Sequence, residues 1–214
     1  MTITASADGS ALGNPGPAGW AWYIDDDTWA AGGWKHATNN QGELKAVLEL
    51  FRATAHVDDD LHILCDSQYV INSVTKWMPG WKAKGWRKGD GKPVLNLDLL
   101  QAIDEAIAGR RYRFEWVKGH IGHVLNEAAD ARARAVAEAF ARGAAIPEGP
   151  GYPGAAQSRG ETVETRHAVA DTLFDFDEPA PAPTAALTTV QQRRILNRAQ
   201  ADGVSVDTLL DRLL

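Results

Sequence analysis

The first 20 residues carry the pattern that most constrains the fold of this chain. Residues 2–7 alternate polar and apolar side chains, which is typical of a half-buried strand, and Asp8 follows directly. Residues 9–19 then contain four glycines and two prolines, a composition that predicts a tight loop shaped by its backbone. An aspartate at the end of a strand beside so small a loop is costly to bury unless a cation neutralises it. The pattern therefore predicts that Asp8 is a metal ligand with acidic partners elsewhere in the chain.

Composition excludes several classes of protein. The chain has 214 residues, 44% of them hydrophobic, and eight tryptophans, which is ample for a packed core. No apolar run approaches the ~18–20 residues needed to cross a bilayer, and the N-terminus lacks the regions of a secretory signal. Cys65 is the single cysteine, so an internal disulfide framework and a cysteine-rich zinc site are excluded. We expect a cytoplasmic protein whose core domain is monomeric.

The distribution of charge predicts more than its total. The formal net charge of −6 argues against a nucleic-acid partner only when it is taken over the whole chain. Between Lys76 and Lys92 there are six basic residues and one acid, Asp90, whereas the acidic excess lies in residues 25–27, residues 58–60 and the C-terminal third. A basic stretch on an acidic protein indicates a local surface for nucleic acid.

Hydrophobic periodicity predicts an α/β domain. We expect five strands, at residues 2–7, 20–24, 28–34, 61–65 and 112–117. We expect four helices, of which the first is opened by Glu43, the second and third follow caps at Ser67 and Asn96, and the fourth begins at about Leu125. In this reading residues 38–43 form a polar loop, and Pro79-Gly80 breaks regular structure ahead of the basic stretch.

The composition changes after Gly143, which predicts three parts to the chain. We expect a folded domain over residues 1–142, then a disordered linker over residues 143–189 that is rich in Pro, Gly, Ala, Glu and Asp. Residues 190–214 recover helical spacing and predict a two-helix tail. Three interpretations of the tail stay open: a protein-interaction or self-association module, a nucleic-acid contact through Arg193, Arg194 and Arg198, and a weakly ordered end.

Four acids stand at element ends or on helices where they can converge. Asp8 ends the first strand, Glu43 opens the first helix, Asp66 follows the fourth strand and Asp130 lies on the last helix. Singly, each is more often a solvated cap or surface acid. Together in one cleft they would repel one another unless divalent cations neutralised them. Oxygen-only ligands suit Mg²⁺ or Mn²⁺, and a pair of such ions can activate water against a phosphodiester.

Five local motifs carry a resemblance to a known family. The motifs are Asp8-Gly9-Ser10 with Gly13-Asn14-Pro15-Gly16-Pro17, Asn39-Asn40 ahead of Glu43, Cys65-Asp66-Ser67-Gln68-Tyr69-Val70, Trp81-Lys82 with Gly85-Trp86 and Lys92-Pro93-Val94, and Trp116-Val117-Lys118-Gly119-His120 with Gly122-His123 and Asn126-Glu127 before Asp130. In order and spacing, residues 2 to about 142 resemble the type 1 ribonuclease H family, which includes bacterial ribonuclease HI. The match departs at Val124, where members often have proline, and this removes no functional group.

The resemblance implies a fold, an activity and a metal site. The fold is a five-stranded mixed sheet flanked by helices, with strands 1–3 antiparallel and strands 4 and 5 parallel to strand 1. The activity is hydrolysis of the RNA strand of an RNA–DNA hybrid by two Mg²⁺ ions, with Mn²⁺ as a substitute, which leaves 5′-phosphate and 3′-hydroxyl ends. Asp8, Glu43, Asp66 and Asp130 are the implied catalytic metal ligands. His120 is the implied aid to proton movement or product release, with an exposed loop histidine as the alternative.

The resemblance also implies how substrate is bound, with little preference for sequence. Contacts to the RNA strand, where the 2′-hydroxyl distinguishes RNA from DNA, are implied for Gly9, Asn14, Glu43 and Gln68. Contacts to the DNA strand are implied for Asn14, Thr38 and Asn40. Residues 77–92 resemble a basic protrusion that binds phosphates through Lys82, Lys84 and Lys88. Trp81 and Trp86 either stack on nucleic acid or pack the protrusion.

Two other functions stay open at this point. A related nuclease on the same fold would cut duplex DNA and leave the hybrid intact. A hybrid-binding module would bind without cleaving, but a pure binder gains nothing from four carboxylates near phosphate.

Overall fold

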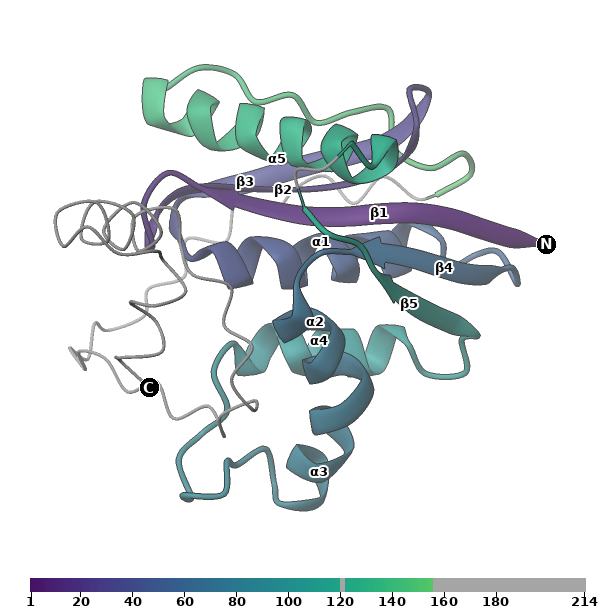
Figure 1. The fold of residues 1–214 in the computed structure, drawn as a ribbon, viewed down its shortest axis with the longest axis vertical. Helices are drawn as coiled ribbons and strands as arrows, with labels where there is room; N and C mark the ends of the chain where they lie inside the picture. The colour runs from purple at the N-terminus through teal and green to yellow at the C-terminus, as the bar shows by residue number, and fades with distance from the viewer. Residues whose placement is uncertain (120–121, 156–214) are drawn as a thin grey trace, which may run out of the picture. The chain divides into compact units, whose positions relative to one another are not determined.

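A five-stranded mixed sheet organises the residues that this computed structural model describes, which are 1–119 and 122–155 (Figure 1). The strand order is β3-β2-β1-β4-β5. β1 pairs antiparallel with β2 and parallel with β4, β2 pairs antiparallel with β3, and β4 pairs parallel with β5. The predicted fold class is therefore confirmed. The strands are β1 (Thr2–Ala11), β2 (Gly16–Asp25), β3 (Thr28–Ala37), β4 (Asp60–Cys65) and β5 (Tyr112–Trp116).

Helices cover both faces of the sheet (Figure 1). On one face lie α1 (Asn39–Ala53) and α4 (Leu97–Ala106), whose buried Leu44, Phe51 and Leu100 join the main core. On the other face lies α5 (Val124–Arg142), the helix that the sequence predicts from about Leu125. α5 approaches β2 closely, because a Cβ on Gly19 would stand only 2.0 Å from the carbonyl oxygen of Ala133. Small residues on both elements allow α5, which contains Asp130, to pack close to the strands.

The first hairpin is longer than the sequence indicates. β1 continues through Ala11, and β2 begins at Gly16, so that only residues 12–15 connect them. Asp8 consequently lies within β1, opposite Ala21 of β2, and not at the strand's end. Glycine disfavours strands on average but does not prevent pairing where both neighbours supply backbone partners. The prediction of a loop over residues 9–19 is wrong for most of its length.

The first helix begins four residues before Glu43 and not at it. The Thr38 hydroxyl accepts a hydrogen bond from the Gln41 N–H at 3.3 Å, and the Gln41 side chain accepts one from the Thr38 N–H at 2.8 Å. This reciprocal capping box starts a helix at Asn39 despite Gly42 in the next turn. The predicted polar loop is therefore the first turn of α1, and Glu43 lies in the second turn.

The basic stretch begins within a series of three short helices. α2 (Gln68–Asn72) is capped by Ser67 as predicted, and it continues into a π-helical turn, η1 (Ser73–Trp77), and α3 (Met78–Ala83). Pro79 sits in the first turn of α3, where its missing N–H costs little, so the predicted break does not occur there. Asn96 occupies the N-cap position of α4 as predicted, but it does so in a left-handed conformation with φ 56° and makes no side-chain cap bond.

The segment after α5 returns to the sheet. The Ala31 N–H donates to the Glu148 carbonyl and the Gly151 N–H to the Trp29 carbonyl, each at 2.9 Å, which places residues 148–151 along β3. The Tyr152 ring meets the His56 ring edge-on at 5.6 Å. This part of the predicted linker is thus held against the domain. The remaining linker and the predicted tail of residues 190–214 lie outside the described residues. Within the described part, no helix is long and apolar enough to cross a membrane.

Candidate metal centre and nucleic-acid interface

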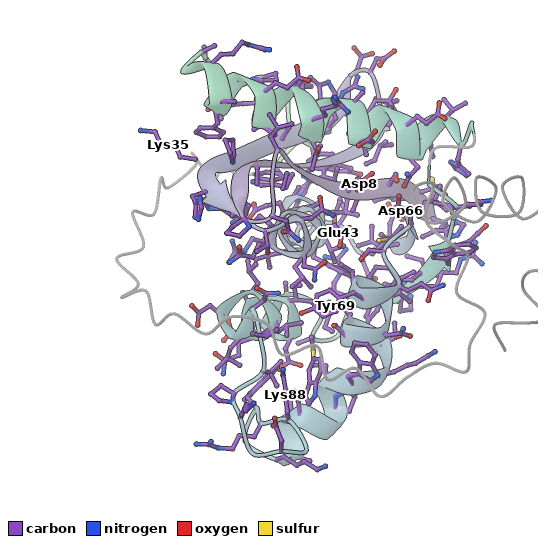
Figure 2. All side chains as sticks on the ribbon, turned by 60° about the vertical axis from the view of Figure 1, so that its left-hand side comes forward. Asp8, Lys35, Glu43, Asp66, Tyr69 and Lys88 are labelled. Atoms are coloured by element: carbon purple, nitrogen blue, oxygen red, sulfur yellow. The ribbon has the colours of Figure 1, made fainter. Side chains whose placement is uncertain are left out.

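Three carboxylates, from β1, from α1 and from the residue after β4, meet at one place (Figure 2). Asp8, Glu43 and Asp66 can each offer one oxygen, and these oxygens lie within 4.8 Å of one another. The parallel pairing of β1 with β4 ends at Ser6 and Leu64, so Asp8 and Asp66 each lie two residues beyond the last pair. Equivalent positions on neighbouring parallel strands are adjacent in space. The register of the sheet therefore brings the first two carboxylates together.

Glycines allow α1 to deliver the third carboxylate. A Cβ on Gly9 would lie 2.3 Å from the backbone nitrogen of Glu43, and one on Gly42 would lie 2.7 Å from the carbonyl oxygen of Gly19. No side chain fits at such distances, so β1 and α1 contact each other through their backbones. This contact places Glu43 beside Asp8.

Hydrogen bonds fix the orientation of the carboxylates. The Asn39 side-chain amide donates to Glu43 Oε1 at 2.8 Å, and the Ser67 hydroxyl donates to Glu43 Oε2 at 2.6 Å. The Gly9 N–H donates to Asp8 Oδ1 at 2.7 Å. Buried carboxylate oxygens need such donors in place of water. The side chains of Asp8 and Glu43 are thus ordered by the protein itself.

Burial and mutual repulsion oppose ionisation of this cluster. Asp8 is 5% exposed and Glu43 8%. Burial first, and then the charges of Asp66, Asp130 and Glu43, raise the pKa of Asp8 to about 8, against the Gly9 hydrogen bond that lowers it. Burial and Asp66 raise the pKa of Glu43 to about 7, while the Ser67 hydrogen bond lowers it. A divalent cation relieves this repulsion, and an all-oxygen donor set fits Mg²⁺ or Mn²⁺.

Asp130 reaches the same site from α5. Asn126, four residues earlier on α5 and 2% exposed, accepts a hydrogen bond from the Ser6 hydroxyl at 3.1 Å. Residues four apart on a helix share a face, and Ser6 lies two residues before Asp8, so this contact directs Asp130 toward Asp8. The negative charge of Asp130 is accordingly one of the causes that raise the Asp8 pKa. Asp130 does not belong to the closest group of three oxygens.

His120 lies outside the described residues, and its implied role stays a prediction. The preceding residue, Gly119, is described. A Cβ on Gly119 would stand 2.3 Å from Asp66 Oδ2, so this loop begins in direct contact with the carboxylate cluster.

The residues implied in substrate contact differ in whether their side chains are available to a substrate. Asn14, in the β1–β2 connection, accepts a hydrogen bond from the Asn39 N–H at 3.1 Å and so lies at the start of α1. Asn40 and Gln68 are exposed in the first turns of α1 and α2, whereas the Thr38 hydroxyl is used as a helix cap. Gly9 is buried beneath α1, where only its backbone is available.

The protrusion carries the basic side chains away from the carboxylates, as Lys88 shows in Figure 2. Trp81 and Trp86 are partly buried against the main core, and the Trp81 ring lies 5.7 Å from that of Trp77, which supports packing of the protrusion. Lys82 forms an ion pair with Asp104 at 2.7 Å. Lys84 is exposed, and Lys88 is partly exposed. The tryptophans build the protrusion, and the lysines differ in their availability to phosphate.

Sequence reasoning missed two polar residues of this site. The motif containing Asn39 gave it no role of its own, and the pattern around Ser67 indicated only a helix cap. The four-residue spacing of Asn39 and Glu43 becomes informative once α1 is known to start at Asn39. The signal for Ser67 is its position directly after a candidate ligand.

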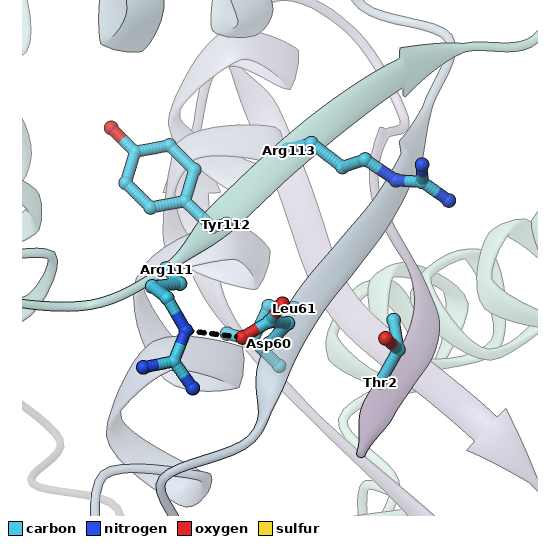
Figure 3. Close-up of a pocket in the computed structure, with 6 residues that line it drawn as sticks. All are labelled: Thr2, Asp60, Leu61, Arg111, Tyr112 and Arg113. Atoms are coloured by element: carbon cyan, nitrogen blue, oxygen red, sulfur yellow. Dashed lines mark hydrogen bonds and ion pairs between the residues drawn. The ribbon is translucent and has the colours of Figure 1, made fainter.

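A pocket elsewhere does not belong to this site (Figure 3). It lies where β4 and β5 begin, whereas Asp66 follows the end of β4. Inside it, the Arg111 guanidinium donates to the Asp60 carboxylate at 2.5 Å. This ion pair uses the one acidic side chain that lines the pocket. The pocket is lined by Thr2, Asp60, Leu61, Arg111, Tyr112 and Arg113.

The chain is similar in sequence and in structure to known ribonuclease H proteins. The sequence model described as RNase H matches residues 2–138. The chain is 55% identical over 150 residues to a ribonuclease H of Tropheryma whipplei (strain Twist), covering 70% of this chain and 93% of that protein. It is 44% identical over 154 residues to a ribonuclease HI of Streptomyces coelicolor, covering 67% of this chain and 66% of that protein. The N-terminal ribonuclease H domain of a Mycobacterium tuberculosis protein, solved as a fusion, is similar in structure, with a TM-score of 0.52, 26% identity, and coverage of 67% of this chain and 99% of that one.

Proposed function

The chain belongs to the type 1 ribonuclease H family, and from this premise we propose that it cleaves the RNA strand of RNA–DNA hybrids at a divalent-metal site. The ligands in this proposal are Asp8, Glu43, Asp66 and Asp130. The observation that carries it is the convergence of carboxylate oxygens from β1, α1 and the end of β4 within 4.8 Å. Without a bound cation, holding these negative charges together in a largely buried site would be energetically unfavourable.

In this proposal, hydrolysis of the phosphodiester depends on divalent cations held by the carboxylates. Two Mg²⁺ ions bound there would supply an activated water and stabilise the leaving 3′-oxygen, giving 5′-phosphate and 3′-hydroxyl ends. Mn²⁺ would substitute, since it accepts the same oxygen ligands. The protein's own part is to hold Asp8 and Glu43 in fixed orientations through the hydrogen bonds of Gly9, Asn39 and Ser67. His120, in this proposal, assists proton movement or product release.

Substrate selection follows from which groups surround the cluster. Asn14 and Asn40 lie at the start of α1, and Gln68 starts α2, so amide side chains flank the acidic centre. Amides can donate to a 2′-hydroxyl and accept from it, which is the group that separates RNA from DNA. Lys84 and Lys88 on the protrusion add phosphate contacts without sequence preference.

A panel of three labelled duplexes of one sequence tests this function: an RNA–DNA hybrid, a duplex DNA and a duplex RNA. With Mg²⁺, we expect cleavage of the RNA strand of the hybrid alone, at several positions, and none when EDTA is added. Ligation and primer-extension assays on the products check for 5′-phosphate and 3′-hydroxyl ends. Cleavage of duplex DNA with the hybrid untouched would identify a DNA nuclease instead.

A further inference from the structure

Glu43 has a side-chain donor on each of its carboxylate oxygens. Asn39 donates to Oε1 at 2.8 Å and Ser67 donates to Oε2 at 2.6 Å. Because Glu43 is only 8% exposed, water cannot readily take the place of these donors. The loss of either donor would leave a buried charged oxygen short of a partner.

The two donors differ in what they connect. Asn39 and Glu43 are four residues apart on α1, so their hydrogen bond orders the carboxylate relative to its own helix. Ser67 follows Asp66 directly in the chain and reaches across to α1. The Ser67 hydrogen bond therefore joins the backbone that carries one candidate ligand to the side chain of another.

Ser67 also caps α2, and the distances show which contact is stronger. The Val70 N–H donates to the Ser67 hydroxyl at 3.4 Å, which is long for such a bond. The bond from the hydroxyl to Glu43 is 2.6 Å, within the range of ~2.5–2.7 Å for hydroxyl donors to charged oxygens. Capping alone does not explain this geometry.

We propose that Ser67 is a positioning residue for the metal site, whose hydroxyl fixes the Glu43 carboxylate against Asp66 and so sets the affinity for divalent cations before nucleic acid binds. The inference rests on the proposed function, in which Glu43 and Asp66 are metal ligands. A glutamate side chain has three rotatable bonds, and holding them in advance reduces the conformational entropy that is lost when a cation binds. Partners that orient metal ligands typically change metal affinity or activity by ~10–100-fold when they are removed.

Three substitutions separate the positioning role from the capping role. Ser67→Thr keeps the hydroxyl for both contacts. Ser67→Ala removes the donor and also the cap, whereas Ser67→Gly removes the donor but keeps most of the capping preference. The affinity for Mg²⁺ and for Mn²⁺ is measured by calorimetry on the full chain without nucleic acid, and urea unfolding in EDTA reports the stability of each variant.

We expect Ser67→Thr to bind the cation like the parent protein, within about 2-fold. Ser67→Ala and Ser67→Gly should both bind about 10-fold more weakly, although their stabilities differ. Parent-like binding by the Ala and Gly variants would overturn the inference. So would affinities that follow stability, with Gly close to the parent and only Ala impaired, because Ser67 would then act as a cap. A parent protein that binds no divalent cation at millimolar concentrations would instead overturn the proposed function, and this inference with it.

Discussion

Gly9 of β1 and Glu43 of α1 are in backbone contact: a Cβ on Gly9 would lie 2.3 Å from the Glu43 nitrogen. Two elements distant in sequence thus meet at the point where both carry functional groups. Asp8 precedes Gly9, and Glu43 provides the second carboxylate of the cluster. The smallest residue of the strand is what allows the helix to bring its acid to the site.

Gly9→Ala should therefore be costly. The added methyl group collides with backbone, which cannot move aside as a side-chain tip can, so we expect a loss of about 2–3 kcal/mol in the free energy of unfolding. Cation affinity should fall as Glu43 shifts. Urea unfolding and calorimetry measure the two effects. Gly80→Ala is the matched control, because a Cβ there has nothing within 4 Å and the position is helical. Equal behaviour of the two variants would contradict the close contact.

The stability of the metal-free protein should fall as pH rises. The folded pKa of Asp8 is raised to about 8 and that of Glu43 to about 7, from ordinary values of 3.8 and 4.5. The folded protein therefore binds more protons than the unfolded chain between these limits, and each group contributes a decrease of up to about 1.4 kcal/mol per pH unit. Urea unfolding in EDTA at pH 5.5 and 8.5 measures the decrease.

Asp8→Asn is the control for this pH effect, because it removes the group with the larger shift. Its stability should decrease less between the two pH values than that of the parent. Mg²⁺ should restore stability to the parent at pH 8.5, since a cation replaces the protons. A parent protein that is more stable at pH 8.5 than at 5.5 in EDTA, relative to Asp8→Asn, would refute the electrostatic account of the cluster.

The lysines of the protrusion should contribute unequally to hybrid affinity. Lys84→Ala and Lys88→Ala together should lower the slope of log affinity against log salt by about 1.8, or about 0.9 for each phosphate that is no longer neutralised. Lys82→Ala should change the slope less, since Lys82 is paired with Asp104 at 2.7 Å. Fluorescence anisotropy with a labelled hybrid, in an uncleaving Asp66→Asn background, gives the slopes. Unchanged slopes in the double variant would exclude Lys84 and Lys88 from phosphate binding.

Residues 143–155 should stabilise the domain. A chain of residues 1–142 lacks the two hydrogen bonds to β3 and the Tyr152 contact, so we expect it to be about 2–4 kcal/mol less stable than a chain of residues 1–155. Thermal and urea unfolding of the two chains test this. Tyr152→Ala in the full chain should reproduce part of the loss. Identical stability of the two truncated chains would mean that the segment contributes nothing.

A chain of residues 1–189 isolates the tail. Its hybrid affinity and its mass in solution, compared with those of the full chain, distinguish the interpretations of residues 190–214. Weaker hybrid binding without the tail supports a nucleic-acid contact, and a lower mass supports self-association. No change in either supports a tail without these roles.

Periodicity predicts the type and order of the main elements, because the amphipathic patterns of α1, α4 and α5 reflect the faces that they bury. Periodicity fails where backbone contacts determine the bounds of a strand or helix. Gly9 and Gly16 pair within strands although glycine suggests a loop, and the Thr38–Gln41 capping box starts α1 inside a polar stretch. Residues 148–151 reach β3 through main-chain hydrogen bonds, which leave no side-chain pattern.

The candidate site can be predicted further than the fold around it. Asp8, Glu43 and Asp66 converge as expected, since equivalent positions on parallel strands follow once strand order is assumed. The partners of Glu43 could not be predicted in the same way. Ser67 lies between β4 and α2 and contacts Glu43 of α1. This contact depends on how the elements pack, which no local sequence pattern encodes.

The most direct test is the rate at which Asp66→Asn cleaves a labelled RNA–DNA hybrid with Mg²⁺ in single turnover. Asp60→Asn is the matched control, because it makes the same change at the other end of β4. We expect Asp66→Asn to lose at least about 1,000-fold in rate, equivalent to about 4 kcal/mol of barrier, while it still binds the hybrid. Asp60→Asn should cleave like the parent. Cleavage by Asp66→Asn at the parental rate would contradict the carboxylate metal site as the centre of catalysis.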